Sequence, residues 1–98
     1  MFARTVTIQM KPGTMDEAAR IYRESVAPAA KQQKGFKGAL LLMAPGDVGK
    51  GMSISMWETM EDLEAGDNSG YLQAQIAKFG PMMAGPPTRD VFIVAVQV

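Results

Sequence analysis

Two segments of this chain, residues 39–44 and 91–98, are apolar at almost every position. A strand with one solvent-facing side alternates apolar and polar residues, whereas a strand covered on both sides is apolar throughout. Both segments are long enough to be strands and much too short to span a membrane. The sequence therefore predicts two strands that need cover on both faces, which a chain of 98 residues has little material to provide.

Two other segments alternate as half-buried strands do. Residues 2–11 carry apolar side chains on one face and mainly threonines on the other. Residues 52–57 place Ser53, Ser55 and Trp57 on one face and apolar side chains on the opposite face. A Gly-rich loop joins this second segment to the apolar strand before it, which predicts a β-hairpin.

Two helices are predicted between the strands. The first begins at Thr14, which stands three residues before Glu17 in the capping-box pattern. Pro28 falls inside this helix, and its missing N–H predicts a kink or a break. The second helix begins with the same spacing at Thr59 and Asp62.

The order strand, helix, strand, strand, helix, strand predicts an α+β fold, ferredoxin-like βαββαβ with a four-stranded antiparallel sheet, as a single domain over residues 1–98. Right-handed crossovers place both helices on one face of the sheet. The other face would then expose a larger apolar patch than monomers tolerate. We therefore expect a second copy of the chain to cover that face in a homodimer.

Composition excludes several classes of protein and site. The chain has no Cys and no His, which removes disulfides, thiolate sites and most transition-metal sites, and no metal site is expected. Ten basic and ten acidic residues balance, without the basic stripe that nucleic-acid binders need. No apolar stretch resembles a membrane span or a signal peptide, so we expect a cytoplasmic protein with neither a membrane nor a nucleic acid as partner.

Trp57 is the strongest candidate for a functional residue. It shares a strand face with Ser53 and Ser55, and a large aromatic beside two small hydroxyls is typical of a ligand pocket with polar groups. In the alternative interpretation, Trp57 closes the end of the core while both serines face solvent. The residue types support both interpretations equally.

Arg4 and two tyrosines are further candidates. Arg4 is in register with the apolar face of the first strand, where a charge needs a partner or an anionic ligand. The simpler expectation is that its side chain reaches solvent from the end of the strand. Tyr22 and Tyr71 are candidate hydrogen-bond donors at the seam between helices and sheet, and core packing would also explain both.

Several motifs together resemble the antibiotic biosynthesis monooxygenase domains over essentially the whole chain. They are Gly35-Phe36-Lys37-Gly38, Ile54-Ser55-Met56-Trp57-Glu58-Thr59, Tyr71-Leu72 and Arg89-Asp90-Val91-Phe92. The resemblance implies a homodimer in which two sheets form an α+β barrel, with a ligand pocket between helices and sheet. It also implies oxygenation of quinol-type compounds by O₂ with no cofactor, neither metal nor flavin.

The resemblance extends to single residues. Trp57 matches the strand-end Trp of the family, and Ser53 stands where the oxygenases carry an Asn, so these two are the expected catalytic residues. Lys78 is matched with a basic residue on the second helix. With Ser55, Arg4, Tyr22 and Tyr71, it completes the expected substrate-binding set. Haem-degrading relatives place a His on that helix, which this chain lacks.

These observations lead to one main function and two alternatives. The main hypothesis is a cofactor-independent monooxygenase acting on a small aromatic or quinol-like compound. Without His, proton removal falls to another side chain with a shifted pKa or to the substrate's own acidity. The alternatives are a non-catalytic, small-molecule-binding or stress-associated dimeric barrel module, and an isomerase or lyase of the same fold.

Overall fold

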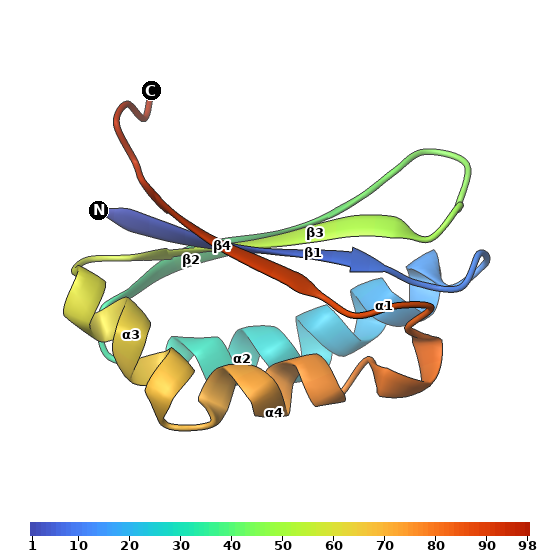
Figure 1. Cartoon of the computed structure of the whole chain (residues 1–98), viewed down its shortest axis with the longest axis horizontal. Coiled ribbons are helices and arrows are strands. Elements are labelled where there is room, and N and C mark those ends of the chain that lie inside the picture. The colour runs from blue at the N-terminus through green and yellow to red at the C-terminus, as the bar shows by residue number, and fades with distance from the viewer.

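The computed structural model describes residues 1–98 as a four-stranded sheet with all of its helices packed on one side (Figure 1). The strands are β1 (Phe2–Gln9), β2 (Phe36–Met43), β3 (Lys50–Trp57) and β4 (Thr88–Ile93). The helices are α1 (Met15–Ile21), the π-helical η1 (Tyr22–Val26), α2 (Ala27–Lys31), α3 (Met60–Asn68), α4 (Tyr71–Ala77) and the 3₁₀ turn η2 (Gly80–Met82). None of these helices has the length and apolar character needed to cross a bilayer.

The sheet has the order β2-β3-β1-β4, and every neighbouring pair is antiparallel. This order places the first and third strands at the centre and the second and fourth at the edges. The α+β ferredoxin-like prediction is therefore confirmed, including the position of the helices on a single face (Figure 1).

The first helical region runs without a break through Pro28. The residues that join α1, η1 and α2 all have right-handed helical dihedral angles. Pro28 comes just after the π-helical turn η1, and this local change of hydrogen-bonding pattern accommodates its missing N–H within the continuous helix. The irregularity predicted at the proline is thus a change of hydrogen-bonding period, from α to π and back.

The two predicted caps have different outcomes. The hydroxyl of Thr59 accepts a hydrogen bond from the Asp62 N–H at 3.1 Å, which confirms the start of α3. Thr14 makes no cap, because its hydroxyl donates instead to the Lys11 carbonyl oxygen at 2.7 Å. The side chain of Asp47, from the β2–β3 loop, accepts the Met15 N–H at 3.0 Å and takes that role.

The last strand was predicted over residues 91–98, and this prediction is wrong at both ends. β4 begins at Thr88, which pairs with Thr7, and ends at Ile93, which pairs with Phe2. Beyond this pair, a single backbone hydrogen bond joins the Val94 N–H to the Met1 carbonyl oxygen at 3.0 Å. The chain then leaves the sheet on the side away from the helices (Figure 1).

The two faces of the sheet have different side chains and different cover. The helix-covered face holds the hydrophobic core, which includes Val6 and Ile8 of β1 and Met10 directly after it. The other face, called here the open face, carries apolar side chains in alternate positions of β2 and β3 and at one position of β4. These are Leu40, Leu42, Met52, Ile54, Met56 and Phe92, of which Leu40, Leu42 and Phe92 are 52, 48 and 54 % exposed.

Candidate functional site

A cavity of about 60 Å³ lies between the helix-covered face of the sheet and the helices η1, α2 and α4. Arg4, Ser53, Ser55 and Trp57 line it from the sheet, and Tyr22, Tyr71 and Gln75 line it from the helices. The remaining lining residues are apolar: Val6, Ile8, Val26, Ala30, Ala39, Leu41, Leu72, Ile76, Phe79 and Met83. The site is thus an apolar chamber with a few convergent polar groups, the usual composition of a small-molecule site.

The volume of the cavity limits what it can hold. Roughly 10–15 Å³ of such space accommodates one water, whose share of liquid volume is about 30 Å³. The cavity, at about 60 Å³, therefore corresponds to about four to six waters, or about 120–180 Å³ of liquid. This is the scale of a compound with one or two aromatic rings.

Ser53 and Tyr22 form one polar group of the cavity. Their hydroxyl oxygens are 2.9 Å apart, and either one can be the donor. The Tyr22 hydroxyl is also 3.4 Å from the Leu40 carbonyl oxygen. Burial raises the pKa of Tyr22, and the Ser53 hydrogen bond opposes this only in part, so Tyr22 is a neutral hydroxyl near pH 7.

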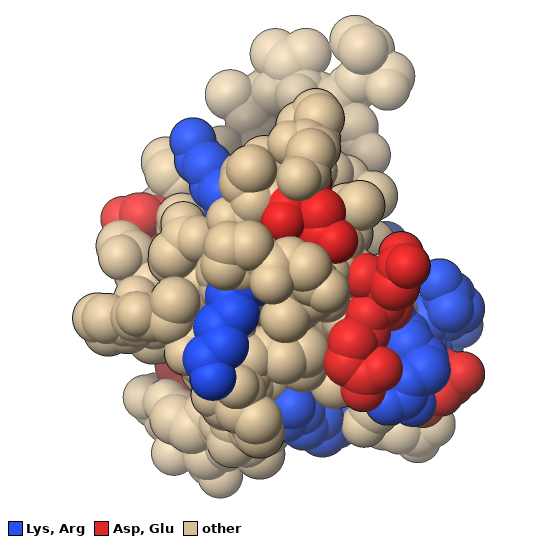
Figure 2. All heavy atoms as spheres, turned by 90° about the vertical axis from the view of Figure 1, so that its right-hand side faces the viewer, with Lys and Arg blue, Asp and Glu red and all other residues tan.

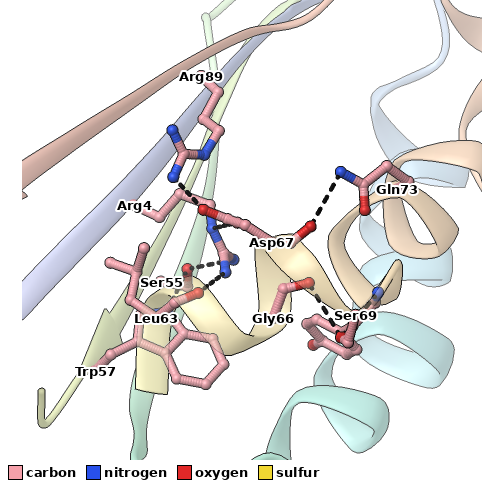
Figure 3. A network of polar contacts seen from close by, with 10 residues as sticks. Arg4, Ser55, Trp57, Leu63, Gly66, Asp67, Ser69, Gln73 and Arg89 are labelled. Atoms are coloured by element: carbon pink, nitrogen blue, oxygen red, sulfur yellow. Dashed lines mark hydrogen bonds and ion pairs between the residues drawn. The ribbon is translucent and has the colours of Figure 1, made fainter. Parts of the chain in front are cut away.

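Ser55 and Trp57 form a second polar group, close to Arg4 (Figure 3). The Ser55 Oγ accepts the indole N–H of Trp57 at 2.9 Å and the Nη1 of Arg4 at 3.3 Å. Trp57 is 1 % exposed, and the guanidinium carbon of Arg4 lies 5.3 Å from the centre of its ring, within cation–π range. Both serines line the cavity with Trp57, so the alternative in which they face solvent is not what the structure shows.

Arg4 is held under α3 rather than reaching solvent. It is 3 % exposed, its Nη2 donates to the Leu63 carbonyl oxygen at 3.2 Å, and its Nε lies 2.9 Å from Asp67 Oδ1. That last contact lacks hydrogen-bond alignment and is an ion pair. Gly66 makes this close packing possible, because a Cβ there would lie 3.0 Å from the Arg4 Nη2.

Asp67 connects Arg4 to a second cation. Its other carboxylate oxygen pairs with Arg89 on β4, so one carboxylate lies between two guanidinium groups (Figure 3). Burial lowers the pKa of Arg4, whereas the attraction of Asp67 raises it and so opposes that shift. The expectation that Arg4 reaches solvent is therefore wrong, because α3 supplies a carboxylate and a carbonyl oxygen above the end of β1.

Tyr71 lines the cavity from the start of α4. Burial raises the pKa of its hydroxyl, while the positive charge of Arg4 lowers it. Tyr71 is therefore a second neutral donor close to Arg4, and the two tyrosines lie on opposite helices across the same chamber.

Lys78 does not line the cavity. Its Nζ donates to the Gln75 side-chain oxygen at 2.7 Å and approaches the Ser25 carbonyl oxygen at 3.4 Å, which links α4 to η1. Gln75 is the residue that lines the cavity in its place. Helical periodicity alone offered a signal for Gln75, since it follows Tyr71 by four residues on α4.

The sequence interpretation also missed Asp67, the ion-pair partner of Arg4. The signal available was weak: a single acidic residue next to a glycine, inside a predicted helix. Finding it required the packing of α3 across the end of β1, which depends on contacts between distant parts of the chain.

The fold and the site together define a two-layer α+β protein with an apolar ligand chamber under its helices. Residues 1–78 match the family described as antibiotic biosynthesis monooxygenase, and the chain belongs to this family. No curated protein sequence matches the chain.

Solved structures of this fold are similar over nearly the full length. The monooxygenase from the gene ActVA-Orf6 of Streptomyces coelicolor, in complex with the ligand nanaomycin D, is 20% identical over 99% of this chain and 89% of that chain, with a TM-score of 0.72. SnoaB from Streptomyces nogalater, described as a cofactor-independent oxygenase, is 12% identical over 99% of this chain and 95% of that chain, with a TM-score of 0.76. A variant of MhuD with two manganese protoporphyrin IX groups per active site is 21% identical over 100% of this chain and 98% of that chain, with a TM-score of 0.78.

The MhuD structure raises the question of whether this chamber fits a porphyrin. A volume of about 60 Å³ is far too small for a four-ring macrocycle, and the chain has no His to act as an axial ligand. No group of three or more His, Cys, Asp or Glu side chains is placed to hold a metal ion. The residues present therefore do not fit a porphyrin.

Proposed function

We propose that this protein is a monooxygenase that oxygenates a small phenol or quinol-like compound with O₂, using neither a metal nor a flavin. Membership of the monooxygenase family supports the reaction class. The observation that carries the proposal is the chemistry of the chamber: its wall is apolar, its hydroxyls are neutral donors, and its one charged side chain is the cation Arg4.

The charge of the chamber favours an electron-rich or anionic substrate. No Asp or Glu lines it, and both tyrosines are neutral near pH 7 because burial raises the pKa of each. The chamber therefore stabilises a phenolate rather than removing a proton with a strong base. In this proposal the substrate hydroxyl releases its proton to water, and the donors around the chamber stabilise the resulting oxyanion.

The reaction balances without an external reductant. One atom of O₂ forms a new carbonyl group at a ring carbon of the phenol, and the other atom leaves as water. The hydrogens in that water come from the broken C–H bond at that carbon and from the phenol O–H. The substrate thus supplies all the electrons that reduce O₂, and the product is a quinone.

The size of the chamber supports both the absence of a flavin and the small substrate. Space equivalent to about four to six waters cannot hold a three-ring isoalloxazine beside a substrate ring. The description of SnoaB as a cofactor-independent oxygenase is consistent with this proposal for a chain of the same fold. A ligand-binding module without turnover has no observation in its favour beyond the cavity itself.

The test is turnover of one-ring and two-ring phenols by the purified protein in air, under nitrogen, and with isotopically labelled O₂. We expect a quinone that carries one labelled oxygen, formed only in the presence of O₂. Trp57→Phe removes the N–H that Ser55 accepts and should lower turnover about fivefold to tenfold, the cost of one hydrogen bond. Ser25→Ala, a serine outside the chamber, is the matched control; phenols recovered unchanged in air would reject the proposal.

We further propose that the protein works as a homodimer, with the open face of the sheet as the interface. Leu40, Leu42 and Phe92 are about half-exposed there, although each belongs to a regular strand. A contiguous apolar face of this kind is unusual on a monomer. The apolar residues 94–98 leave the sheet on the same side (Figure 1), so a second copy docked on this face would also meet them.

The end of the molecule drawn in Figure 2 offers no comparable feature for a charged partner. Figure 2 shows acidic and basic side chains side by side on one end of the molecule, without a field of one sign. Arg20, for example, pairs with Glu17 and Glu24 on the same helix. Mixed, paired charges of this kind are typical of a solvent-facing helix surface.

A further inference from the structure

Ser55 has an unusual hydrogen-bonding state. A serine hydroxyl has two acceptor positions and a single O–H to donate. Both acceptor positions of Ser55 are filled, one by the Trp57 indole N–H and the other by the Arg4 guanidinium. The Ser55 O–H has no acceptor within the chain, and its oxygen lines the chamber. Ser55 can therefore only donate, and the chamber is where an acceptor can approach.

The donors on Ser55 also increase its strength as a donor. Arg4 carries a full positive charge and is held in place by Asp67 and the Leu63 carbonyl oxygen. A hydroxyl that accepts from a cation has a more polarised O–H and makes stronger hydrogen bonds to anions. The group formed by Ser55, Trp57 and Arg4 is thus arranged to stabilise an oxyanion of the substrate. A neutral substrate hydroxyl would need an acceptor for its own proton, which this group does not offer.

Ser53 differs from Ser55 although both lie on the same face of β3. Its oxygen shares one hydrogen bond with the Tyr22 hydroxyl, and either partner can donate. The pair keeps both donor and acceptor capacity, so it can contact an oxygen that is neutral or that changes protonation during a reaction. The chamber therefore offers two chemically distinct oxygen sites on one strand.

The distance between these two sites is set by the strand. Residues two apart on a strand lie on the same face and are separated by about 6.5–7 Å. A phenol can lie across such a span, with its oxygen hydrogen-bonded at one end and the opposite ring carbon in contact at the other. A ring lying along β3 can thus present one atom to Ser55 while the opposite carbon faces Ser53 and Tyr22.

We propose that Ser55 is the catalytic residue that donates to the phenolate oxygen of the substrate, and that oxygen is inserted at the ring carbon opposite, beside Ser53 and Tyr22. This inference rests on the proposed function and narrows its substrate class to phenols or naphthols with a hydrogen at the carbon opposite the hydroxyl. At that carbon the C–H bond breaks and the new C–O bond forms. The second oxygen atom leaves as water, and the product is a para-quinone.

The first test needs no turnover. 4-Nitrophenol changes its visible absorbance on ionisation, so a pH titration of the bound compound measures its pKa in the chamber. We expect the bound phenol to have a lower pKa than the free phenol. Ser55→Ala should raise that bound pKa by about one to two units, the equivalent of one hydrogen bond to a charged group.

Two variants separate this role from a general loss of structure. Ser55→Thr keeps the hydroxyl and should restore the low pKa of the bound phenol, while Ser25→Ala should leave it unchanged. Circular dichroism and thermal unfolding show whether each variant is folded. If Ser55→Ala is unfolded, the pKa of the bound phenol is compared between Ser55→Thr and Trp57→Phe instead. Only Trp57→Phe removes a donor to Ser55, so only this variant should raise the bound pKa.

The second test concerns the position of oxygen insertion. A phenol with a methyl group opposite its hydroxyl should bind with the same Ser55-dependent pKa but should give no quinone. Binding of nitrophenol with an unshifted pKa, or an identical shift in Ser55→Ala, would overturn the inference even if turnover were found. Conversely, a Ser55-dependent shift without O₂ consumption by any phenol would reject the proposed function and leave intact only the role of Ser55 as donor to the bound phenolate.

Discussion

Each of the two faces of the sheet carries side chains that are unusual for its degree of cover. The face covered by helices contains Arg4, Ser53 and Ser55, whereas the face without any cover contains Leu40, Leu42 and Ile54 among its side chains. In a self-sufficient two-layer domain the covered face is apolar and the bare face is polar. This sheet departs from that rule on both faces, because its covered face includes polar side chains and its bare face includes large apolar ones.

These departures support the proposal that each face is completed by something other than this chain. Fully burying a side chain such as Leu or Ile is worth about 1.5–3 kcal/mol, so several apolar residues on a bare face represent stabilisation that only a partner can provide. Polar groups on the covered face cost stability unless they are paired. Arg4 is paired within the chain, but the Ser55 hydroxyl proton is not, which is the condition expected for a ligand site.

The largest expected effect comes from removing the carboxylate that pairs the buried charge. Asp67→Ala leaves Arg4 buried without its partner and should lower the free energy of unfolding by about 3–5 kcal/mol. Arg89→Ala, at the exposed end of the same network, is the matched control and should cost about 1 kcal/mol or less. Urea denaturation of both variants measures the difference; equal effects would show that the covered face does not depend on the buried pair.

The second prediction tests the open face. Ile54 lies between Leu40 and Thr5 at the centre of that face, so Ile54→Lys would bury an unpaired charge in the proposed interface. We expect the dimer dissociation constant to rise by about 100-fold, or about 2.7 kcal/mol, measured by sedimentation velocity. Ala74→Lys, on the exposed side of α4, should leave the dimer dissociation constant unchanged. A wild-type protein that sediments as a monomer at micromolar concentration would contradict the proposed dimer on the open face.

A third prediction asks whether the polar groups of the covered face serve stability or function. The double variant Ser53→Ala and Tyr22→Phe removes both partners of one hydrogen bond, which is close to neutral for folding, within about 1 kcal/mol. Turnover of phenols should nevertheless fall by about tenfold or more. Unfolding and activity are measured in parallel on the double variant. A loss of stability with full activity would assign Ser53 and Tyr22 a structural role.

The smallest effect concerns alkaline pH. Burial raises the pKa of Tyr22 in the folded chain above its value of about 10 in the unfolded chain. A raised pKa means that the associated stability is fully present below about pH 10 and is lost as pH rises through the folded-state pKa. Chemical denaturation across this range should show a smaller loss for Tyr22→Phe than for wild type. Identical pH profiles would contradict the burial of this hydroxyl.

Much of the fold follows from local patterns in the sequence. The period-two alternation placed Val6 with the apolar residues on one face of β1, and Ser53 with Trp57 on one face of β3. The structure retains both assignments, and the strand pairing brings the two sets to the same side of the sheet. The capping signal at Thr59 was also sufficient, since the cap involves residues three positions apart. The same signal failed at Thr14, because Asp47 from a distant loop reaches the first N–H of the helix.

The ends of β4 could not be predicted from its own residues. Its apolar composition continues to Val98, but a strand lasts only as long as its neighbour offers hydrogen bonds. The register with β1 ends at Phe2 and Ile93 and so fixes the end of the strand. The remaining apolar residues extend past the sheet, towards the side that we propose a second copy covers.

The sequence by itself determined which residues share a face of each strand, because side-chain direction along a strand alternates whatever surrounds it. Tertiary structure alone decided how the polar groups of the covered face are paired. α3 crosses the end of β1 and brings Asp67 to Arg4, and that contact positions the guanidinium against Ser55 and Trp57. These contacts join residues far apart in the chain, so no local pattern encodes them, and they make Ser55 a donor.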